Sequence, residues 1–189
     1  MVGSPAGMLN NYKKFMSLNQ KKILSSALIK QVRSQFRLNW QGAHGIKHWA
    51  RVLEIGIRLS ELSGANQQVV QLFALFHDSC RKNEIIDPGH GRRGADLALK
   101  LKGQYFDLPE EAFQLLQIAC RNHTSADTHE NVTVKTCFDA DRLDLGRVGI
   151  VPDPKYLCTE AGRTNEMIDW AYQHSIEGYV PTNILGSYL

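Results

Sequence analysis

The chain has 189 residues, 43% of them hydrophobic, which suffices for one compact domain with a substantial core and is too little for two comfortable ones. Its formal net charge of +3 and pI near 8.7 are mild, which argues against a stable nucleic-acid partner and favours a small anionic one. No stretch approaches the roughly 18 apolar residues that span a bilayer, and the N-terminus lacks a signal-peptide core, so we expect no membrane partner and a cytoplasmic location.

The predicted elements are all helices, because 3.6-residue hydrophobic periodicity recurs between Gly, Pro and Asn or Asp, whereas strand-like alternation is scarce. Gly64 and Gly103 are expected helix stops, and Pro109 suits a first helical turn, followed by two glutamates that complement the helix dipole. The sequence predicts helices over residues 21–35, 48–63, 67–79, 92–102, 109–122, 132–143 and 162–177.

These elements divide the chain into three parts. We expect residues 1–20 to be an N-terminal extension, of which residues 1–7 are interpreted as an expression-tag remnant. Residues 21–178 are predicted to form one all-α domain, and residues 179–189 an irregular tail whose tyrosines could serve a homodimer contact. The cysteines are widely spaced without a C-x-x-C motif, and we expect them to be reduced and structural.

The most informative feature is the adjacent pair His77 and Asp78, which ends the apolar run of residues 69–76. His77 follows Phe73 by four residues and therefore faces the buried side of its helix. His48 lies on a buried stripe as well, because apolar residues follow it at steps of four and three. Polar chelating side chains directed into an apolar interior indicate a metal site.

Asp141 is a further polar residue in an apolar setting. It follows Val134 and Phe138 and precedes Leu145 and Val148 at helical spacing. An unpaired charge in such a row would cost several kcal/mol or more. A bound cation is the economical explanation for this carboxylate.

In that order, the residues resemble the motif of the HD-domain superfamily of metal-dependent phosphohydrolases. The resemblance covers about residues 44–146, and the matching positions are His48, His77, Asp78 and Asp141. It implies a single compact helical bundle in which these four side chains hold a metal between core helices, and it usually implies hydrolysis of a phosphate ester.

Two other carboxylates, Asp139 and Asp144, compete by residue type for the last ligand position. The family pattern Ala-Asp-Arg-Leu and the apolar row both select Asp141. We expect Asp139 to lie at the surface or to contact the ligand residues without binding the metal itself. His44 shares a helix face with His48, but the superfamily takes its ligand from the position of His48.

Mixed nitrogen and oxygen ligands suit a divalent Mn, Fe, Co, Ni, Mg or Zn ion. Four protein ligands around a six-coordinate ion leave two positions for a phosphate oxygen and a water. His90 and His123 occur where two-metal members of the superfamily place extra ligands, with Asp78 as the natural bridge. In a mononuclear site these two histidines instead bind phosphate or transfer protons. We favour one ion over two.

Basic residues are frequent near the motif. Arg81, Lys82 and Arg92 lie in the segment that joins His77 and Asp78 to the region of His90, so we expect some of them to bind phosphate. The leading hypothesis is a phosphohydrolase that acts on a small phosphorylated metabolite, with a nucleotide favoured. The alternatives are a di-iron oxygenase of the HD type and a non-catalytic module that binds a metal or a nucleotide.

Overall fold

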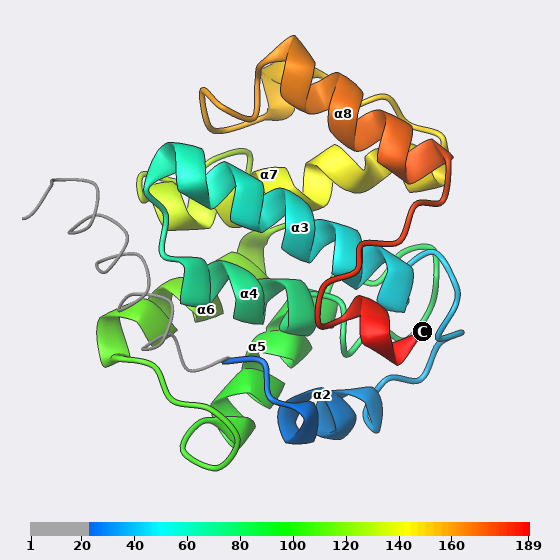
Figure 1. Ribbon diagram of the computed structural model, residues 1–189. Helices are drawn as coiled ribbons and strands as arrows, with labels where there is room; N and C mark the ends of the chain where they lie inside the picture. Colours follow the sequence, from blue (N-terminus) through cyan, green and yellow to red (C-terminus); the bar gives the residue numbers. More distant parts are fainter. Residues whose placement is uncertain (1–22) are drawn as a thin grey trace, which may run out of the picture.

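The computed structural model describes residues 23–189, which form α-helices and short 3₁₀ segments without a β-strand, so the predicted all-α fold is confirmed (Figure 1). The helices are α2 (Ser26–Arg33), α3 (Ile46–Ser63), α4 (Gln67–Phe76), α5 (His90–Leu101), α6 (Glu110–Asn122), α7 (Val132–Arg142) and α8 (Asn165–Ile176). The 3₁₀ segments are η1 (Leu143–Val148), η2 (Pro154–Tyr156) and η3 (Gly186–Tyr188). The expected N-terminal extension and tag remnant lie outside the described residues.

Each predicted helix has a counterpart, and its ends follow from local capping. The side chain of Asn66 accepts hydrogen bonds from the first turn of α4, and Thr164 does the same for α8, which therefore starts later than predicted. Gly64 ends α3 in the left-handed conformation at a φ of 74°. Pro109 precedes the first turn of α6, which carries the two expected glutamates.

One periodicity prediction is wrong. The buried row was expected to continue from Asp141 through Leu145 to Val148, but the α-helix ends at Arg142 and gives way to the tighter η1. A 3₁₀-helix turns by 120° for each residue, so the residues that follow change face. Leu145 is half-buried and Val148 is 46% exposed.

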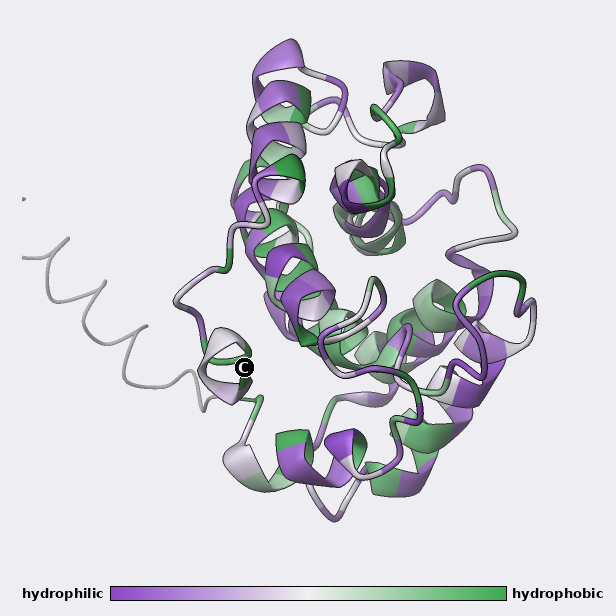
Figure 2. Ribbon diagram, turned by 90° about the vertical axis from the view of Figure 1, so that its right-hand side faces the viewer, coloured by the Kyte–Doolittle hydropathy of each residue, from purple (hydrophilic) through white to green (hydrophobic). Residues whose placement is uncertain are grey.

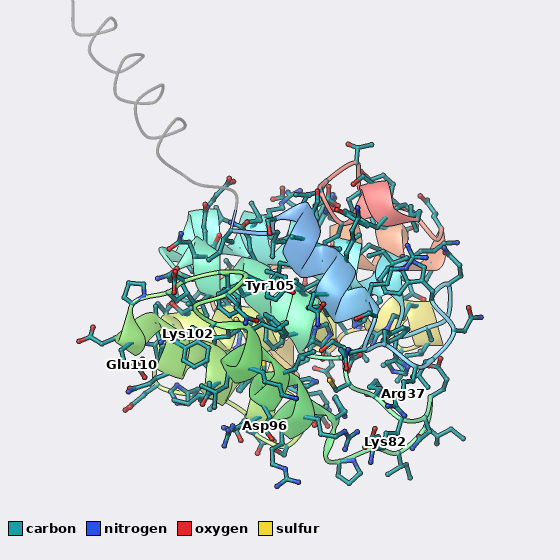
Figure 3. All side chains as sticks on the ribbon, turned by 90° about the horizontal axis from the view of Figure 1, so that it is seen from below. Arg37, Lys82, Asp96, Lys102, Tyr105 and Glu110 are labelled. Carbon is teal, nitrogen blue, oxygen red and sulfur yellow. The ribbon has the colours of Figure 1, made fainter. Side chains whose placement is uncertain are left out.

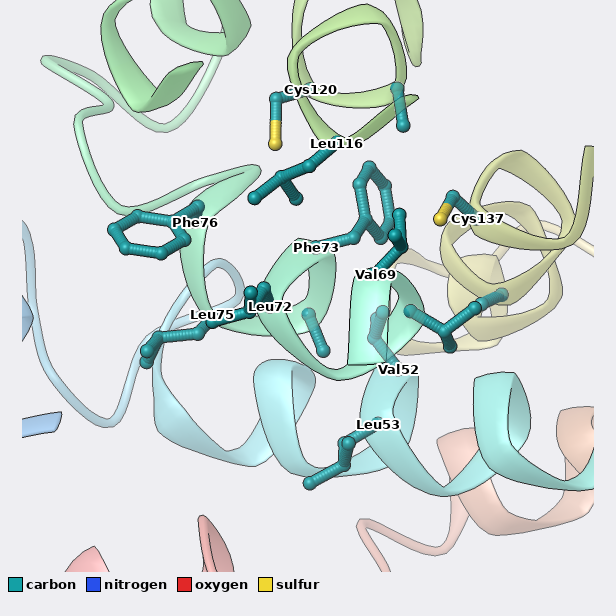
Figure 4. Close-up of a cluster of buried hydrophobic side chains, with 14 of the residues drawn as sticks. Val52, Leu53, Val69, Leu72, Phe73, Leu75, Phe76, Leu116, Cys120 and Cys137 are labelled. Atoms are coloured by element: carbon teal, nitrogen blue, oxygen red, sulfur yellow. The ribbon is translucent and has the colours of Figure 1, made fainter. Parts of the chain in front are cut away.

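The core lies between α3, α4, α6 and α7, which pack against one another around the centre of the molecule (Figure 1). Phe73 and Val69 point from α4 toward Leu116 of α6 and Cys137 of α7 (Figure 4). Hydrophobic and hydrophilic residues share the same helices, as expected of helices that bury one face (Figure 2). The periodic apolar residues of the sequence therefore form one continuous core.

Helix α5 approaches the neighbouring backbone closely through two glycines. A Cβ atom on Gly94 would lie 2.2 Å from the carbonyl oxygen of Phe76, at the end of α4. A Cβ atom on Gly91 would lie 2.1 Å from the carbonyl oxygen of Cys120, in the last turn of α6. Only glycine permits these contacts, which hold the start of α5 against the ends of α4 and α6.

The C-terminal tail packs along α3 of its own chain. Asn183 donates a hydrogen bond to the carbonyl of Ala50 (2.9 Å), and the indole of Trp40 donates one to the carbonyl of Tyr188 (3.0 Å). Leu185 is fully buried. The predicted irregular tail is thus fastened to the domain, and its expected role in a homodimer stays a prediction.

Two expectations concern the whole described region. All four cysteines are free, and three of them are buried: Cys120, Cys137 and Cys158. Among residues 23–189, no helix combines the length and the apolar character that a membrane crossing requires.

We predict that Gly94→Ala lowers the free energy of unfolding by about 1–3 kcal/mol, because the new methyl group would collide with backbone that cannot move aside cheaply. Urea denaturation followed by circular dichroism measures the change. Gly89→Ala is the matched control, because its Cβ would meet only the flexible end of Arg93. A Gly94→Ala protein as stable as the wild type would contradict the close approach.

Candidate metal centre

Two buried histidines face each other at the centre of the site. His48 lies in the first turn of α3, and His77 directly follows the last residue of α4. Both side chains are fully buried, and their Nε2 atoms lie 3.0 Å apart. The structure thus brings together the two imidazoles that periodicity directs inward.

The other ring nitrogen of each histidine already has a partner. His77 Nδ1 lies 3.1 Å from the carbonyl oxygen of Phe73, which can only accept, so Nδ1 carries the proton. His48 Nδ1 donates in the same way to Asp144 Oδ2 (2.7 Å). Each Nε2 therefore presents a lone pair to the other, and two acceptors at this distance repel unless a cation lies beside them.

Two carboxylates complete this group. Asp78 Oδ2 lies 3.6 Å from His48 Nε2 and 3.7 Å from His77 Nε2, and Asp141 Oδ1 lies 3.4 Å and 3.9 Å from the same atoms. Ligands about 2.1 Å from a common ion are separated by about 3 Å or slightly more, so the ligand atoms of His48, His77 and Asp78 fit one divalent cation. Asp141 Oδ1 lies beside both imidazoles of that group. We call His48, His77, Asp78 and Asp141 the primary group.

A second group forms on the other side of Asp78. Asp78 Oδ1 lies 3.1 Å from His90 Nε2 and 3.9 Å from His123 Nε2, and the two Nε2 atoms are 2.9 Å apart. The Nδ1 atoms again donate to carbonyl oxygens, those of Asp87 (2.5 Å) and Cys120 (2.8 Å). We call Asp78, His90 and His123 the secondary group.

The protonation states follow from burial and contacts. Burial lowers the pKa of His77 to about 3 and also lowers the pKa of His123, so both rings are neutral. Burial alone would raise the pKa of Asp78 and Asp141, but contacts with the surrounding histidines outweigh it and hold both pKa values well below their usual range. Ionised carboxylates and neutral imidazoles are all electron-pair donors, which is the donor set of a cation site.

Asp144 holds the His48 ring in place through Nδ1, the ring nitrogen that does not face His77. Sequence analysis missed this role. The Asp144 carboxylate accepts hydrogen bonds from His48, from both Nε (2.6 Å) and Nη2 (3.1 Å) of Arg51, and from the hydroxyl of Ser175 (2.6 Å). Burial alone would raise the pKa of Asp144, but the His48 hydrogen bond and the nearby arginines lower it. The sequence feature that could have indicated this role is Arg51, because a charged residue one turn after His48 on a buried face requires an acidic partner.

Two arginines lie beside the ligand atoms. Arg81 was predicted, and its Nη1 atom lies 3.3 Å from Asp78 Oδ1 and 3.4 Å from His90 Nε2. Arg147 was not predicted, and its Nη2 atom lies 3.9 Å from Asp141 Oδ1. Arg147 follows Asp141 by six residues, a spacing that no α-helical pattern places on the same face.

Several other candidates lie apart from both groups. Lys82 and Arg92 are exposed, and the backbone N–H of Lys82, rather than its ammonium group, contacts Asp87. His44 pairs with Glu84. Asp139 is buried rather than at the surface, and it accepts hydrogen bonds from the backbone of residues 158 and 159. Neither His44 nor Asp139 belongs to the primary or the secondary group.

No protein-family model matches the chain, and no curated protein does. A search of solved structures finds a crystal structure at 1.45 Å resolution from an uncultured Thermotogales bacterium, described as a predicted HD superfamily hydrolase. The two chains are 27% identical with a TM-score of 0.62, and the match covers 86% of this chain and 93% of the other.

We predict that Asp144→Asn weakens the binding of a divalent metal by about 10–100-fold, because the neutral amide no longer holds the His48 ring with its proton on Nδ1. Competition with a chromogenic chelator measures the affinity. Ser175→Ala is the matched control, because it removes another hydrogen bond of Asp144 and leaves the contact with His48. Equal losses in both variants would contradict the orienting role and indicate a general effect on stability.

Proposed function

Because the chain belongs to the HD-domain superfamily, we propose that it is a metal-dependent phosphohydrolase that acts on a small phosphorylated metabolite, with a nucleotide favoured. The observation that carries this proposal is the convergence of two imidazole lone pairs and two ionised carboxylates in the primary group. The proposed ligands are therefore His48, His77, Asp78 and Asp141.

The donor set suits Mn, Fe, Co, Ni, Mg or Zn, because it offers nitrogen and oxygen atoms and no thiolate. A divalent ion bound there would lower the pKa of a coordinated water and neutralise charge on a phosphoryl group. The side chain of Asp141 is 16% exposed, whereas those of the other three ligands are at most 3% exposed. Substrate and water therefore reach the primary group from the side of Asp141.

The remaining residues of the site have distinct tasks in this proposal. The guanidinium of Arg81 beside Asp78 stabilises the negative charge that develops on phosphoryl oxygens in the transition state. His90 and His123 present only Nε2 to the site, because their Nδ1 atoms donate to carbonyl oxygens. A proton for the leaving group therefore has to be held on Nε2. Burial lowers the pKa of His123, which disfavours it as the proton donor. This leaves His90 for the role, and its Nε2 would have to take up a proton before donating it.

The contacts of Arg81 favour one ion over two. A second ion in the secondary group would bind Asp78 Oδ1, His90 Nε2 and His123 Nε2. The guanidinium of Arg81 already lies within hydrogen-bonding distance of the first two of these atoms and supplies a positive charge there. Among the described residues, Arg81 contacts Asp78 only at Oδ1, and Arg147 lies 3.9 Å from Asp141 Oδ1, so no arginine comes as close to the atoms that face the primary ion.

We predict one divalent ion per chain in protein purified without chelator, as measured by elemental analysis. His77→Ala is expected to lose this ion, because it removes a ligand from the primary group. His90→Ala is expected to keep it, because Arg81 and the primary group remain. Two ions in the wild type and one in His90→Ala would contradict the mononuclear site and support a bridging role for Asp78.

We predict that Asp78→Ala abolishes both metal binding and turnover, since Asp78 contributes to both groups. The assay is phosphate release from a panel of phosphorylated metabolites with Mn, Co, Ni or Mg. Asp153→Ala is the control, because that carboxylate pairs at the surface with Lys155. Turnover retained by Asp78→Ala would contradict the proposal.

The same panel separates the alternative functions. A di-iron oxygenase of the HD type would consume oxygen, so hydrolysis under anaerobic conditions would exclude it. A metal-loaded protein that releases phosphate from no member of the panel would instead support a binding module.

A further inference from the structure

A cavity lined by basic residues lies beside the candidate metal centre. A cavity of about 620 Å³ is lined by Gln35, Arg37, Cys80, Arg81, Lys82 and Arg93. Four of these six residues carry a positive charge, and the cavity has no carboxylate in its wall. We call it the basic cavity.

Three separate segments bring these charges together. Arg37 lies in the loop after α2, Arg81 and Lys82 lie in the loop after α4, and Arg93 is in the first turn of α5. Arg37 and Lys82 lie on the same side of the molecule when it is seen from below (Figure 3). A single helix face cannot explain the cluster, because the positions converge only through the fold.

The positive charges of the basic cavity are only partly balanced. Arg93 pairs with Asp87 (2.5 Å), and Arg81 contacts Asp78 (3.3 Å). Among residues 23–189, no salt bridge joins the side chain of Arg37 or Lys82 to a carboxylate. Cations that share a hollow repel one another, and a bound anion relieves that repulsion.

The other two lining residues, Cys80 and Gln35, bring no carboxylate to the cavity. A bound anion would therefore supply the balancing charge.

We propose that the basic cavity is a phosphate-binding site separate from the proposed metal ligands. Arginine offers a planar fork to two phosphate oxygens and lysine a movable point charge, so the lining suits a phosphate group better than a single carboxylate. A phosphate ion requires far less volume than the cavity provides. The cavity therefore has room for a ligand larger than inorganic phosphate, one phosphate group of which would lie against Arg37 and Lys82.

Arg81 connects this site to the metal centre. Its Nη1 atom contacts Asp78 and His90, while its Nε and Nη2 atoms lie 3.4 Å from the carbonyl oxygens of Asn83 and Ile85. The same side chain lines the basic cavity. The phosphate bound there is either a second phosphate of the substrate or part of a separate ligand, and in both cases it contacts the wall of the metal centre.

The test is a calorimetric titration of the metal-loaded protein with inorganic phosphate. The variants are Arg37→Ala, Lys82→Ala and the double variant, and Lys100→Ala removes an exposed charge of α5 that does not line the cavity. We expect each single variant to weaken phosphate binding by about tenfold, which corresponds to about 1.4 kcal/mol, with metal content unchanged. The Lys100→Ala protein is expected to bind phosphate like the wild type.

Unchanged phosphate affinity in the double variant would overturn the inference, and so would an equal loss in Lys100→Ala. The titration requires no turnover. Phosphate that binds at the metal would persist in the double variant, whereas phosphate that binds in the basic cavity would be lost, so the two sites are distinguished. A second titration compares adenosine 5′-monophosphate with adenosine 3′,5′-bisphosphate. A larger loss for the bisphosphate in the double variant assigns the cavity to a second phosphate of one ligand, whereas equal losses assign it to a separate ligand.

Discussion

The site depends on one physical constraint, which is that four buried histidines have their Nδ1 protons committed elsewhere. Carbonyl oxygens accept three of these protons and the Asp144 carboxylate accepts the fourth, so every Nε2 atom is left as a lone pair. These lone pairs converge on the Asp78 carboxylate from both sides. An interior filled with electron-pair donors is costly unless a cation is present, and the polar contacts around the site maintain this arrangement.

The ends of helices make this arrangement possible. The Phe73 carbonyl accepts both the backbone N–H of His77 (2.9 Å) and its Nδ1 proton. The Cys120 carbonyl, in the last turn of α6, accepts the Nδ1 proton of His123, and these two histidines cap α4 and α6. His90 opens α5, whose glycines allow its backbone to approach the same two helix ends. The candidate metal centre therefore uses carbonyl oxygens at the ends of α4 and α6 to orient its histidines.

Sequence periodicity was sufficient to predict the helices and the inward direction of His48 and His77, because both depend on the spacing of residues along one helix. The resemblance to the HD motif then selected Asp141 from three nearby carboxylates. Periodicity failed beyond Arg142, where the 3₁₀ segment changes the face of each residue and brings Asp144 and Arg147 to the site. Such a change depends on tertiary contacts, such as the hydrogen bond from Ser175 of α8 to Asp144, which no local pattern contains.

Arg81 belongs both to the candidate metal centre and to the neighbouring basic cavity. Its guanidinium contacts Asp78 and His90, so in the proposed mononuclear site it would supply the positive charge of the secondary group in place of a second ion. An anion in the basic cavity attracts the same guanidinium from the other side, because Arg81 also lines that cavity. A phosphate bound there would therefore compete with Asp78 for Arg81 and would change the charge at the secondary group.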